Sequence, residues 1–263
     1  PATGTKTVMA PMEALHRTFG EPLGSMAYPL TGETAVSAAP GGVSQRFQGA
    51  NAYSSSLGAF AVFGVFRTEY ERLGGPGGVM GWPIARDKCG LSGGGCAQQV
   101  EHGTLFYSSA TGTWAVMGAM DTLHRSLGEP LGSLRYPVSN EVTVSATPGG
   151  VFQRFQSANA YSSSLGAFAV FGVFRTEYER LGGPSGVMGW PLAGDQCGLS
   201  GGGCVQRFEH GTMFYSPATG TRTVMGALDA LHRSLGEPLG SLAYPVSGET
   251  AVSATPGGVV QRF

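Results

Sequence analysis

A fixed period of 54 residues runs through this chain and constrains its fold more than any other feature. Turn glycines recur with that spacing at Gly4, Gly58, Gly112, Gly166 and Gly220. Prolines that follow an aromatic residue recur with the same spacing at Pro29, Pro83, Pro137, Pro191 and Pro245. A unit of this size cannot bury its apolar face alone, so such repeats stack on their neighbours in solenoids, propellers or closed arrays. The period therefore predicts one repeat architecture built from five units.

A second period of 108 residues shows that the units are of two alternating types. Residues 48–96 and 156–204 differ at only five of 49 positions. One type has a tryptophan before its proline and a pair of cysteines, and the other type has a tyrosine there and no cysteine. We therefore expect two classes of surface site rather than five equal ones.

The segment 205–240 serves as the type unit for secondary structure. Residues 205–216 are rich in aromatic residues and partly alternating, which predicts a strand, and 217–220 predict a turn into a returning strand at 221–225. Leucines at 228, 231 and 235 then form one apolar stripe on a short helix, which Gly236 and Pro238 end. Each unit is thus predicted to be a β-hairpin followed by a short helix, in a β-rich α+β fold.

The two ends of the sequence suggest how the array closes. The chain stops partway through a first hairpin strand at 261–263, and it starts at 1–4, just before the turn of another hairpin. Five periods from Gly4 reach position 274, so the last strand nearly meets the first turn. We expect residues 1–263 to form a single domain, a propeller-like ring of five pseudo-symmetric units closed by pairing of the terminal segments, which also removes a free sheet edge.

Composition narrows the class of partner. Charged residues make up only 13% of the chain and the net charge is -1, so there is no basic stripe for nucleic acid or for an anionic membrane surface. No run of 18 apolar residues predicts a membrane span, and the first residues lack a charged and apolar leader, so a secretion signal is expected to be cleaved or absent. Neutral polar partners fit this composition best.

All four cysteines lie in two copies of one glycine-rich segment, Cys89–Cys96 and Cys197–Cys204. Six intervening residues rich in glycine can fold back so that the two cysteines approach the separation of a disulfide. The alternative is a zinc site, but the ligand spacing is unusual and no nearby His or Cys pair completes it. The segments predict two local disulfides and hence an oxidising, extracytoplasmic location.

Several of these landmarks resemble the LGFP repeat family. They are the 54-residue period, the segments Val79–Pro83 and Val187–Pro191, and the run Glu101–Ser108 with its following Ala-Thr-Gly turn. The tyrosine units depart from the family's Gly-aromatic-Pro core at residues 27–29, 135–137 and 243–245. The resemblance covers essentially the whole chain and implies a secreted, envelope-associated module of actinobacterial type, often appended to mycoloyltransferases or cell-wall hydrolases and thought to contact wall glycan.

Two repeated residue types are candidates for ligand binding. Flat aromatic faces can stack on sugar rings, and equivalent weak sites give avidity for a polymer; the candidates are Trp82, Trp190, Tyr28, Tyr136 and Tyr244. The alternative is that these aromatics fill the core between units. Repeated arginines can bond glycan hydroxyls or a carboxylate, or can instead pair with a glutamate such as Glu209 or Glu237; they are Arg46, Arg154, Arg207 and Arg262.

Other motifs that could carry chemistry have simpler explanations. His16, His124 and His232 flank the predicted helices and are expected to be partly buried structural residues rather than metal ligands. Ser92 and Ser200 lie in Gly-x-Ser-x-Gly runs, but these fall inside the predicted disulfide loops, not between a strand and a helix. No catalytic residue, metal or cofactor is predicted.

The sequence therefore predicts a secreted, lectin-like module that binds a neutral glycan or cell-wall polysaccharide without catalysis. Two alternatives remain: a scaffold that contacts another envelope protein, and a secreted hydrolase or esterase. The sequence does not predict the oligomeric state.

Overall fold

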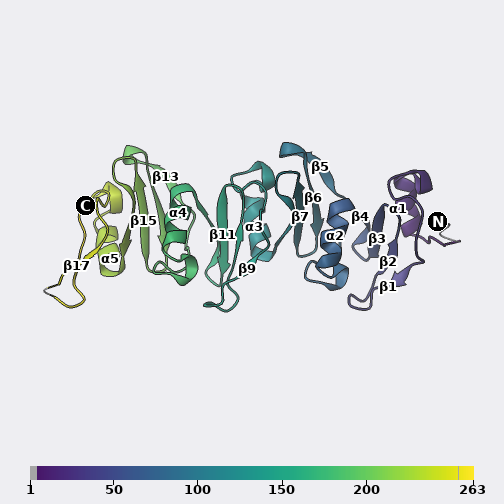
Figure 1. Cartoon of the computed structure of the whole chain (residues 1–263), viewed down its shortest axis with the longest axis horizontal. Helices are drawn as coiled ribbons and strands as arrows, with labels where there is room; N and C mark the ends of the chain where they lie inside the picture. The colour runs from purple at the N-terminus through teal and green to yellow at the C-terminus, as the bar shows by residue number, and fades with distance from the viewer. Residues whose placement is uncertain (1–4, 254) are drawn as a thin grey trace. The chain divides into compact units, whose positions relative to one another are not determined.

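The computed structural model describes residues 5–253 and 255–263, and the chain divides into two compact units, residues 1–140 and 141–263. Figure 1 shows the elements in chain order. The α-helices are α1 (Met12–Thr18), α2 (Gly64–Arg72), α3 (Gly118–Ser126), α4 (Gly172–Arg180) and α5 (Gly226–Ser234). The short 3-10 helices are η1 (Glu21–Leu23), η2 (Gly75–Gly77), η3 (Ser92–Gly94), η4 (Glu129–Leu131), η5 (Gly183–Ser185), η6 (Ser200–Gly202) and η7 (Glu237–Leu239).

Four antiparallel sheets of four strands make up most of the described chain, and each is a meander of consecutive strands. The first sheet contains β1 (Thr34–Ala35), β2 (Val43–Arg46), β3 (Ala50–Ser55) and β4 (Gly58–Phe63), and the second contains β5 (Lys88–Leu91), β6 (Gly95–Val100), β7 (Gly103–Ser108) and β8 (Gly112–Met117). The third contains β9 (Val142–Thr143), β10 (Val151–Arg154), β11 (Ala158–Ser163) and β12 (Gly166–Phe171), and the fourth contains β13 (Gln196–Leu199), β14 (Gly203–Phe208), β15 (Gly211–Ser216) and β16 (Gly220–Met225). A two-stranded sheet of β17 (Thr250–Ala251) and β18 (Val259–Val260) follows. The chain is thus β-rich, with one helix after each four-stranded sheet (Figure 1).

The predicted hairpin unit was too small. The helix and the returning strand are confirmed as α5 and β16, but the predicted strand 205–216 is two antiparallel strands, β14 and β15. A two-residue turn at Glu209 and His210 separates them, with Phe208 opposite Gly211. A Cβ atom at Gly211 would lie 2.3 Å from the Val224 carbonyl oxygen, so the close approach of β15 and β16 requires glycine there.

The two types of unit differ in the loop between the first two strands of each sheet. In the second and fourth sheets this loop carries the predicted disulfides, Cys89–Cys96 and Cys197–Cys204, which are confirmed. In the first and third sheets it contains Pro40–Gly42 and Pro148–Gly150. We call the corresponding units, each a sheet with its following helix, cystine repeats and Pro-Gly-Gly repeats.

The hydrophobic core lies between neighbouring repeats rather than inside one. Helix α2, which follows the first sheet, packs against β7 and β8 of the second sheet, and its Phe66 and Tyr70 share a core with Met80 and Leu105. Helix α4 packs in the same way against β15 and β16. The expectation that a single unit cannot bury its own apolar face is therefore confirmed within each compact unit of the chain.

Helix α5 does not bury the face that the leucine stripe predicts. The predicted stripe residues Leu231 and Leu235 are 50% and 40% exposed, whereas Asp229 and His232 are buried. Helix α3 buries the equivalent residues, Asp121 and His124. The stripe prediction was therefore wrong for Leu231 and Leu235.

One hydrogen bond recurs at the helix of every repeat and ties it to the loop that begins the next one. The hydroxyls of Tyr70 and Tyr178 donate to the carbonyls of Gly81 and Gly189, at 2.5 and 2.6 Å. In the cystine repeats a histidine takes the tyrosine's place: Nε2 of His124 donates to Arg135 and that of His232 to Ala243, at 2.7 and 2.8 Å. These histidines are fully buried, and burial lowers the pKa of His124.

No closed ring is shown in the described residues, so the ring expectation is not confirmed and stays a prediction. Each four-stranded sheet is complete in itself and needs no strand from the other end of the chain. Strand β18 pairs with β17, and Thr5–Met9 form no strand in the described part of the chain. Gly4, the turn expected to join the two ends, lies outside the described residues. The expectation of a single domain over residues 1–263 stays a prediction.

Candidate functional site

The two tryptophans predicted to stack on sugars are core residues. Trp82 and Trp190 are 7% and 3% exposed, and each indole covers a glycine in the preceding Pro-Gly-Gly loop. A Cβ atom at Gly42 would lie 2.3 Å from the Trp82 ring, and one at Gly150 would lie 2.4 Å from Trp190. Trp190 Nε1 also donates to Thr147 Oγ1 at 3.0 Å. Their ring faces are therefore not available to a ligand, which corrects their assignment as surface platforms.

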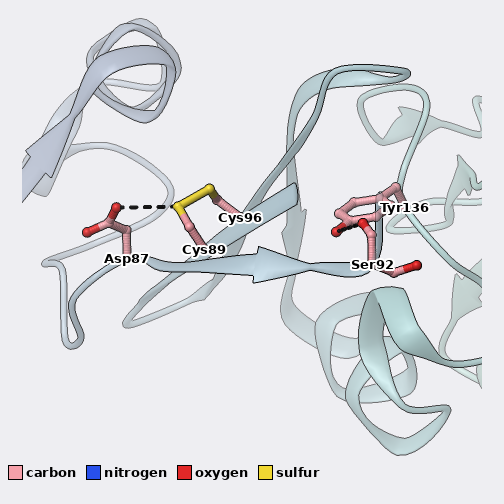
Figure 2. The surroundings of a disulfide bond; sticks show 5 residues. All are labelled: Asp87, Cys89, Ser92, Cys96 and Tyr136. Atoms are coloured by element: carbon pink, nitrogen blue, oxygen red, sulfur yellow. Dashed lines mark hydrogen bonds between the residues drawn. A yellow bond between two sulfur atoms is a disulfide. The ribbon is translucent and has the colours of Figure 1, made fainter. Parts of the chain in front are cut away.

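Two of the three tyrosines at the same position cover the cystine loops. Tyr136 is 4% exposed, and its hydroxyl donates to the Ser92 carbonyl at 2.9 Å, as Figure 2 shows. Tyr244 is partly buried and donates to the Ser200 carbonyl at 3.1 Å. Tyr28 differs, because no loop covers it in the described residues and it is 50% exposed. Of the five predicted aromatics, Tyr28 alone presents an open ring.

The arginines of the Gln-Arg-Phe segments do not gather in one place. Arg207 pairs with Glu237 at 2.7 Å, so the alternative of an ion pair is confirmed there. Arg46 and Arg262 are exposed, and their backbone N–H groups donate to Thr31 and Ser247 side chains. Arg154 lies 5.8 Å over the ring of Phe152, on the rim of a pocket.

The remaining motifs have structural partners. The carboxylates of Glu101 and Glu209 each accept the backbone N–H of the tryptophan before Pro83 or Pro191, at 2.7 Å. Ser92 lies in η3 at the tip of a cystine loop, where its carbonyl is bound by Tyr136 (Figure 2). A nucleophile elbow lies between a buried strand and a helix, so this serine does not have that setting.

A candidate site is a pocket of about 580 Å³ on the third sheet, which we call the Phe152 pocket. Its floor is one face of the β10–β11 pair. Across the two strands Phe152 pairs with Tyr161, and Arg154 pairs with Asn159. The four side chains are therefore neighbours on one face of the sheet. The rings of Phe152 and Tyr161 are stacked, with centroids 5.9 Å apart and planes at 24°. The lining residues are Thr143, Val144, Ser145, Phe152, Arg154, Asn159, Tyr161, Glu179, Gly182, Gly183, Pro184 and Ser185.

Polar groups in the pocket are held in fixed positions. The Asn159 amide is 3% exposed and donates to Glu179 Oε1 at 2.6 Å and to the Tyr161 hydroxyl at 3.2 Å. Glu179 comes from α4 and is exposed. Burial, with a smaller contribution from the Glu179 charge, raises the pKa of Tyr161 to about 12. Tyr161 is 3% exposed and Phe152 stacks on it, so the ring that the pocket offers is that of the half-buried Phe152, with a carboxylate and a guanidinium at the rim.

The Tyr161 hydroxyl makes folding sensitive to alkaline pH. In the unfolded chain this group ionises near its ordinary pKa of 10.0, but in the folded chain it keeps its proton up to about 12. The stabilisation is present in full below pH 10 and is lost as the pH rises through 12. Between pH 9 and pH 11.5 we expect residues 141–263 to lose about 2 kcal/mol of unfolding free energy on this account. Burial also raises the pKa of Tyr178 in the same unit, so the total loss is larger than this. Urea unfolding of the parent and of Tyr161→Phe at the two pH values isolates the Tyr161 contribution; a Phe variant with the same loss as the parent would contradict the assignment.

The comparison with known protein families follows the repeats seen in the structure. A family model described as LGFP repeat matches residues 26–78, 80–132, 134–186 and 188–240. The chain belongs to the LGFP repeat family. No curated protein matches the chain.

The matched segments redefine the unit. Each LGFP repeat begins just before the aromatic-Pro pair and contains one four-stranded sheet and its helix. Four LGFP repeats are thus detected over residues 26–240, and the turn glycine at 220 belongs to the sheet of the fourth. The expectation of five units over residues 1–263 stays a prediction. The flanking α1 and β17–β18 are parts of the same pattern outside the matched segments.

The Phe152 pocket belongs to one type of LGFP repeat. In the first repeat Asn51 donates to Glu71 and Tyr53 in the same way, but Ser44 replaces the phenylalanine. In the cystine repeats the amide–carboxylate pair is absent; in the second repeat Arg125 donates to Thr104 at 2.9 Å and pairs with Asp121. The alternation of two site classes is therefore present, with the aromatic floor in the third repeat.

Sequence reasoning identified Arg154 in this pocket and missed Phe152, Asn159, Tyr161 and Glu179. The sequence carries a signal for Asn159, Tyr161 and Glu179, because the same three residues recur in the near-identical segment 48–96. Phe152 lies just before the second of these segments, and the equivalent residue before the first is Ser44.

In the described residues no helix is long or apolar enough to cross a membrane.

Proposed function

We propose that this chain is a secreted, non-catalytic module of the cell envelope that binds a carbohydrate in the Phe152 pocket. The observation that carries the proposal is the half-buried Phe152 ring, held in place on the buried Tyr161, beside a bonded Asn159–Glu179 pair. Sugar rings present apolar C–H faces and polar hydroxyl edges, and aromatic floors with fixed polar groups at the side recognise both. A volume of about 580 Å³ lies in the range of small-ligand sites and suits one or two sugar units.

The other features agree with this proposal. The two disulfides favour an oxidising location outside the cytoplasm. LGFP repeats are repeat modules rather than a catalytic family, and the serines of the Gly-x-Ser-x-Gly runs lie in cystine loops. A net charge of -1 suits a neutral glycan better than a polyanion.

The experiment compares the two Pro-Gly-Gly repeats, since they form a matched pair. Purified chain is tested on an array of cell-wall polysaccharides, and the ligand that binds is then titrated by calorimetry. Phe152→Ser reproduces the residue of the first repeat, so the fold should hold while affinity falls about 10-fold. Ser44→Phe should add a second binding site to the titration.

Two outcomes would count against the proposal. Absence of binding to all wall polysaccharides would contradict the proposal, and equal affinity for the parent chain and Phe152→Ser would place the ligand elsewhere.

A scaffold function has one supporting observation: Leu23, Leu131 and Leu239 occupy equivalent places and are 93%, 71% and 64% exposed. Attachment to envelope protein that Leu131→Glu abolishes and Phe152→Ser leaves intact would favour that alternative.

A further inference from the structure

A second pocket, of about 710 Å³, lies on the second LGFP repeat, which is a cystine repeat. We call it the Glu101 pocket. It extends from the turn that joins β6 to β7 to the first residues of α3, and its volume lies in the range of small-ligand sites. Its lining is partly apolar, with Val79, Ile84 and Met117, and partly charged, with Glu101, Asp121 and Arg125.

The buried carboxylate of this pocket has one oxygen without a hydrogen-bond donor. Asp121 is 7% exposed, and its Oδ2 accepts a hydrogen bond from Arg125 Nε at 2.7 Å. Its Oδ1 is buried and accepts none from the described residues. Leaving a buried acceptor unpaired is costly, and a bond from a charged donor to a carboxylate is among the stronger hydrogen bonds. A cationic donor that enters the pocket therefore gains a strong acceptor at Asp121.

A second carboxylate is held in place at the same pocket. Glu101 Oε2 accepts the Trp82 N–H at 2.7 Å, and the Glu101 N–H donates to the Trp82 carbonyl at 2.9 Å. In the described part of the chain no ion pair joins Glu101 to a cation. The permanently charged side chains of the lining are thus two carboxylates and one guanidinium, an excess of negative charge that attracts a cation.

The same arrangement recurs in the fourth repeat, which belongs to the other compact unit. Asp229 is 2% exposed, pairs with Arg233 at 2.8 Å, and also has a buried Oδ1 that accepts no hydrogen bond from the described residues. Glu209 accepts the Trp190 N–H at 2.7 Å. The equivalent apolar positions are occupied by Val187, Leu192 and Met225. The two carboxylates and their apolar neighbours are therefore a feature of both cystine repeats.

The Pro-Gly-Gly repeats show that the loop does not need these charges in order to fold. In the first repeat Gln48 stands in place of Glu101, and Arg67 stands in place of Asp121. The third repeat has the same two residue types. Gln48 keeps the contact to the backbone, since its Oε1 accepts the Tyr28 N–H at 3.3 Å. A neutral amide is thus sufficient for the loop, and the carboxylates of the cystine repeats supply charge beyond what the loop requires.

We propose that the Glu101 pocket and its counterpart in the fourth repeat bind a primary ammonium group carried on an apolar stem, as in an alkylamine or a lysine-type side chain. The ammonium group donates to the carboxylates of Glu101 and Asp121, and the stem lies against Val79, Ile84 and Met117. An ammonium group is a compact charge with three donors, which suits two carboxylates. The site differs from the carbohydrate site in ligand and in repeat type, so it does not rest on the proposed function.

The test titrates the full chain with n-pentylammonium and, as a control with the same stem and no charge, with 1-pentanol. Two-dimensional NMR follows the amide signals of Gly103 and Gly211, which lie next to the glutamate turns of the two sites. Both signals should shift to saturation with the amine, and 1-pentanol should bind at least about 10-fold more weakly. Nα-acetyl-lysine methylamide is titrated alongside, and the amine that binds more tightly identifies the source as a free amine or a peptide.

Matched variants assign the binding to the carboxylates. Glu101→Gln installs the residue of the first repeat, so the fold should hold while affinity at the Gly103 signal falls at least about 10-fold and the Gly211 signal responds as in the parent. Glu209→Gln should give the reverse result. Phe152→Ser should leave both responses intact, which separates this proposal from the carbohydrate site.

Four outcomes would overturn the proposal. They are the absence of a saturable shift at either glycine, equal affinity for n-pentylammonium and 1-pentanol, an unchanged affinity at Gly103 in Glu101→Gln, and loss of amine binding in Phe152→Ser. The last of these would place the amine in the Phe152 pocket instead.

Discussion

Trp190→Ala is expected to lower the unfolding free energy of residues 141–263 by about 3–5 kcal/mol. The indole is 3% exposed and packs with Tyr178, Met188 and Phe208 at the junction of the third and fourth repeats. Its removal leaves a cavity between the two repeats and an unpaired Thr147 hydroxyl. Urea unfolding followed by circular dichroism measures the loss, since this variant removes the unit's only tryptophan as a fluorescence probe.

Tyr28→Ala is a comparison in the other compact unit, residues 1–140, because it removes an aromatic at the same place in the repeat, and its effect is read on the unfolding free energy of that unit. Its ring is half exposed, so the loss should be no more than about 0.5 kcal/mol. A Trp190→Ala chain as stable as the parent would show that the indole is not a core residue. If that chain had also lost glycan binding, the sugar-stacking assignment of the tryptophans would be restored.

Gly186→Ala is expected to cost at least about 3 kcal/mol, from backbone crowding rather than from a positive φ. A Cβ atom there would lie 1.8 Å from the Leu181 carbonyl oxygen and 2.9 Å from Cα of Gly182. Both neighbours are backbone atoms of the turn that ends α4, so the turn itself must open. The same contact recurs at Gly24, Gly78, Gly132 and Gly240.

The adjacent residue provides the control for this variant. Ser185→Gly installs the residue that the first repeat has at Gly77, and we expect a change within about 1 kcal/mol, measured in the same urea experiment. If Gly186→Ala were as mild as Ser185→Gly, the tight turn after α4 would not be required for packing of the third repeat on the fourth.

Periodic features of the fold were predictable from the sequence, because they depend on local chemistry. The helix at 227–235, the cystine loops and the alternation of two unit types follow from apolar spacing, from glycine-rich segments between cysteines and from direct comparison of residues. The turn at Glu209 and His210 was missed, since neither residue is a usual two-residue turn former and the strands on both sides are similarly aromatic.

Burial of the aromatics could not be predicted from one unit alone. Trp190 is buried by Gly150 of the preceding repeat, and the sequence does not state which surface meets which. The Phe152 pocket was missed for a related reason, because its floor joins β10 to β11 and its wall comes from α4. Side chains with no regular spacing between them become neighbours only through strand register.

The rule that tyrosine covers a cystine loop and tryptophan covers a Pro-Gly-Gly loop has a consequence for how such proteins change length. Loss or gain of one repeat joins two units of the same type and mismatches an aromatic with its loop. A block of two repeats, 108 residues, is the smallest insertion or deletion that leaves every junction matched. The near-identity of residues 48–96 and 156–204, which lie one such block apart, agrees with this rule.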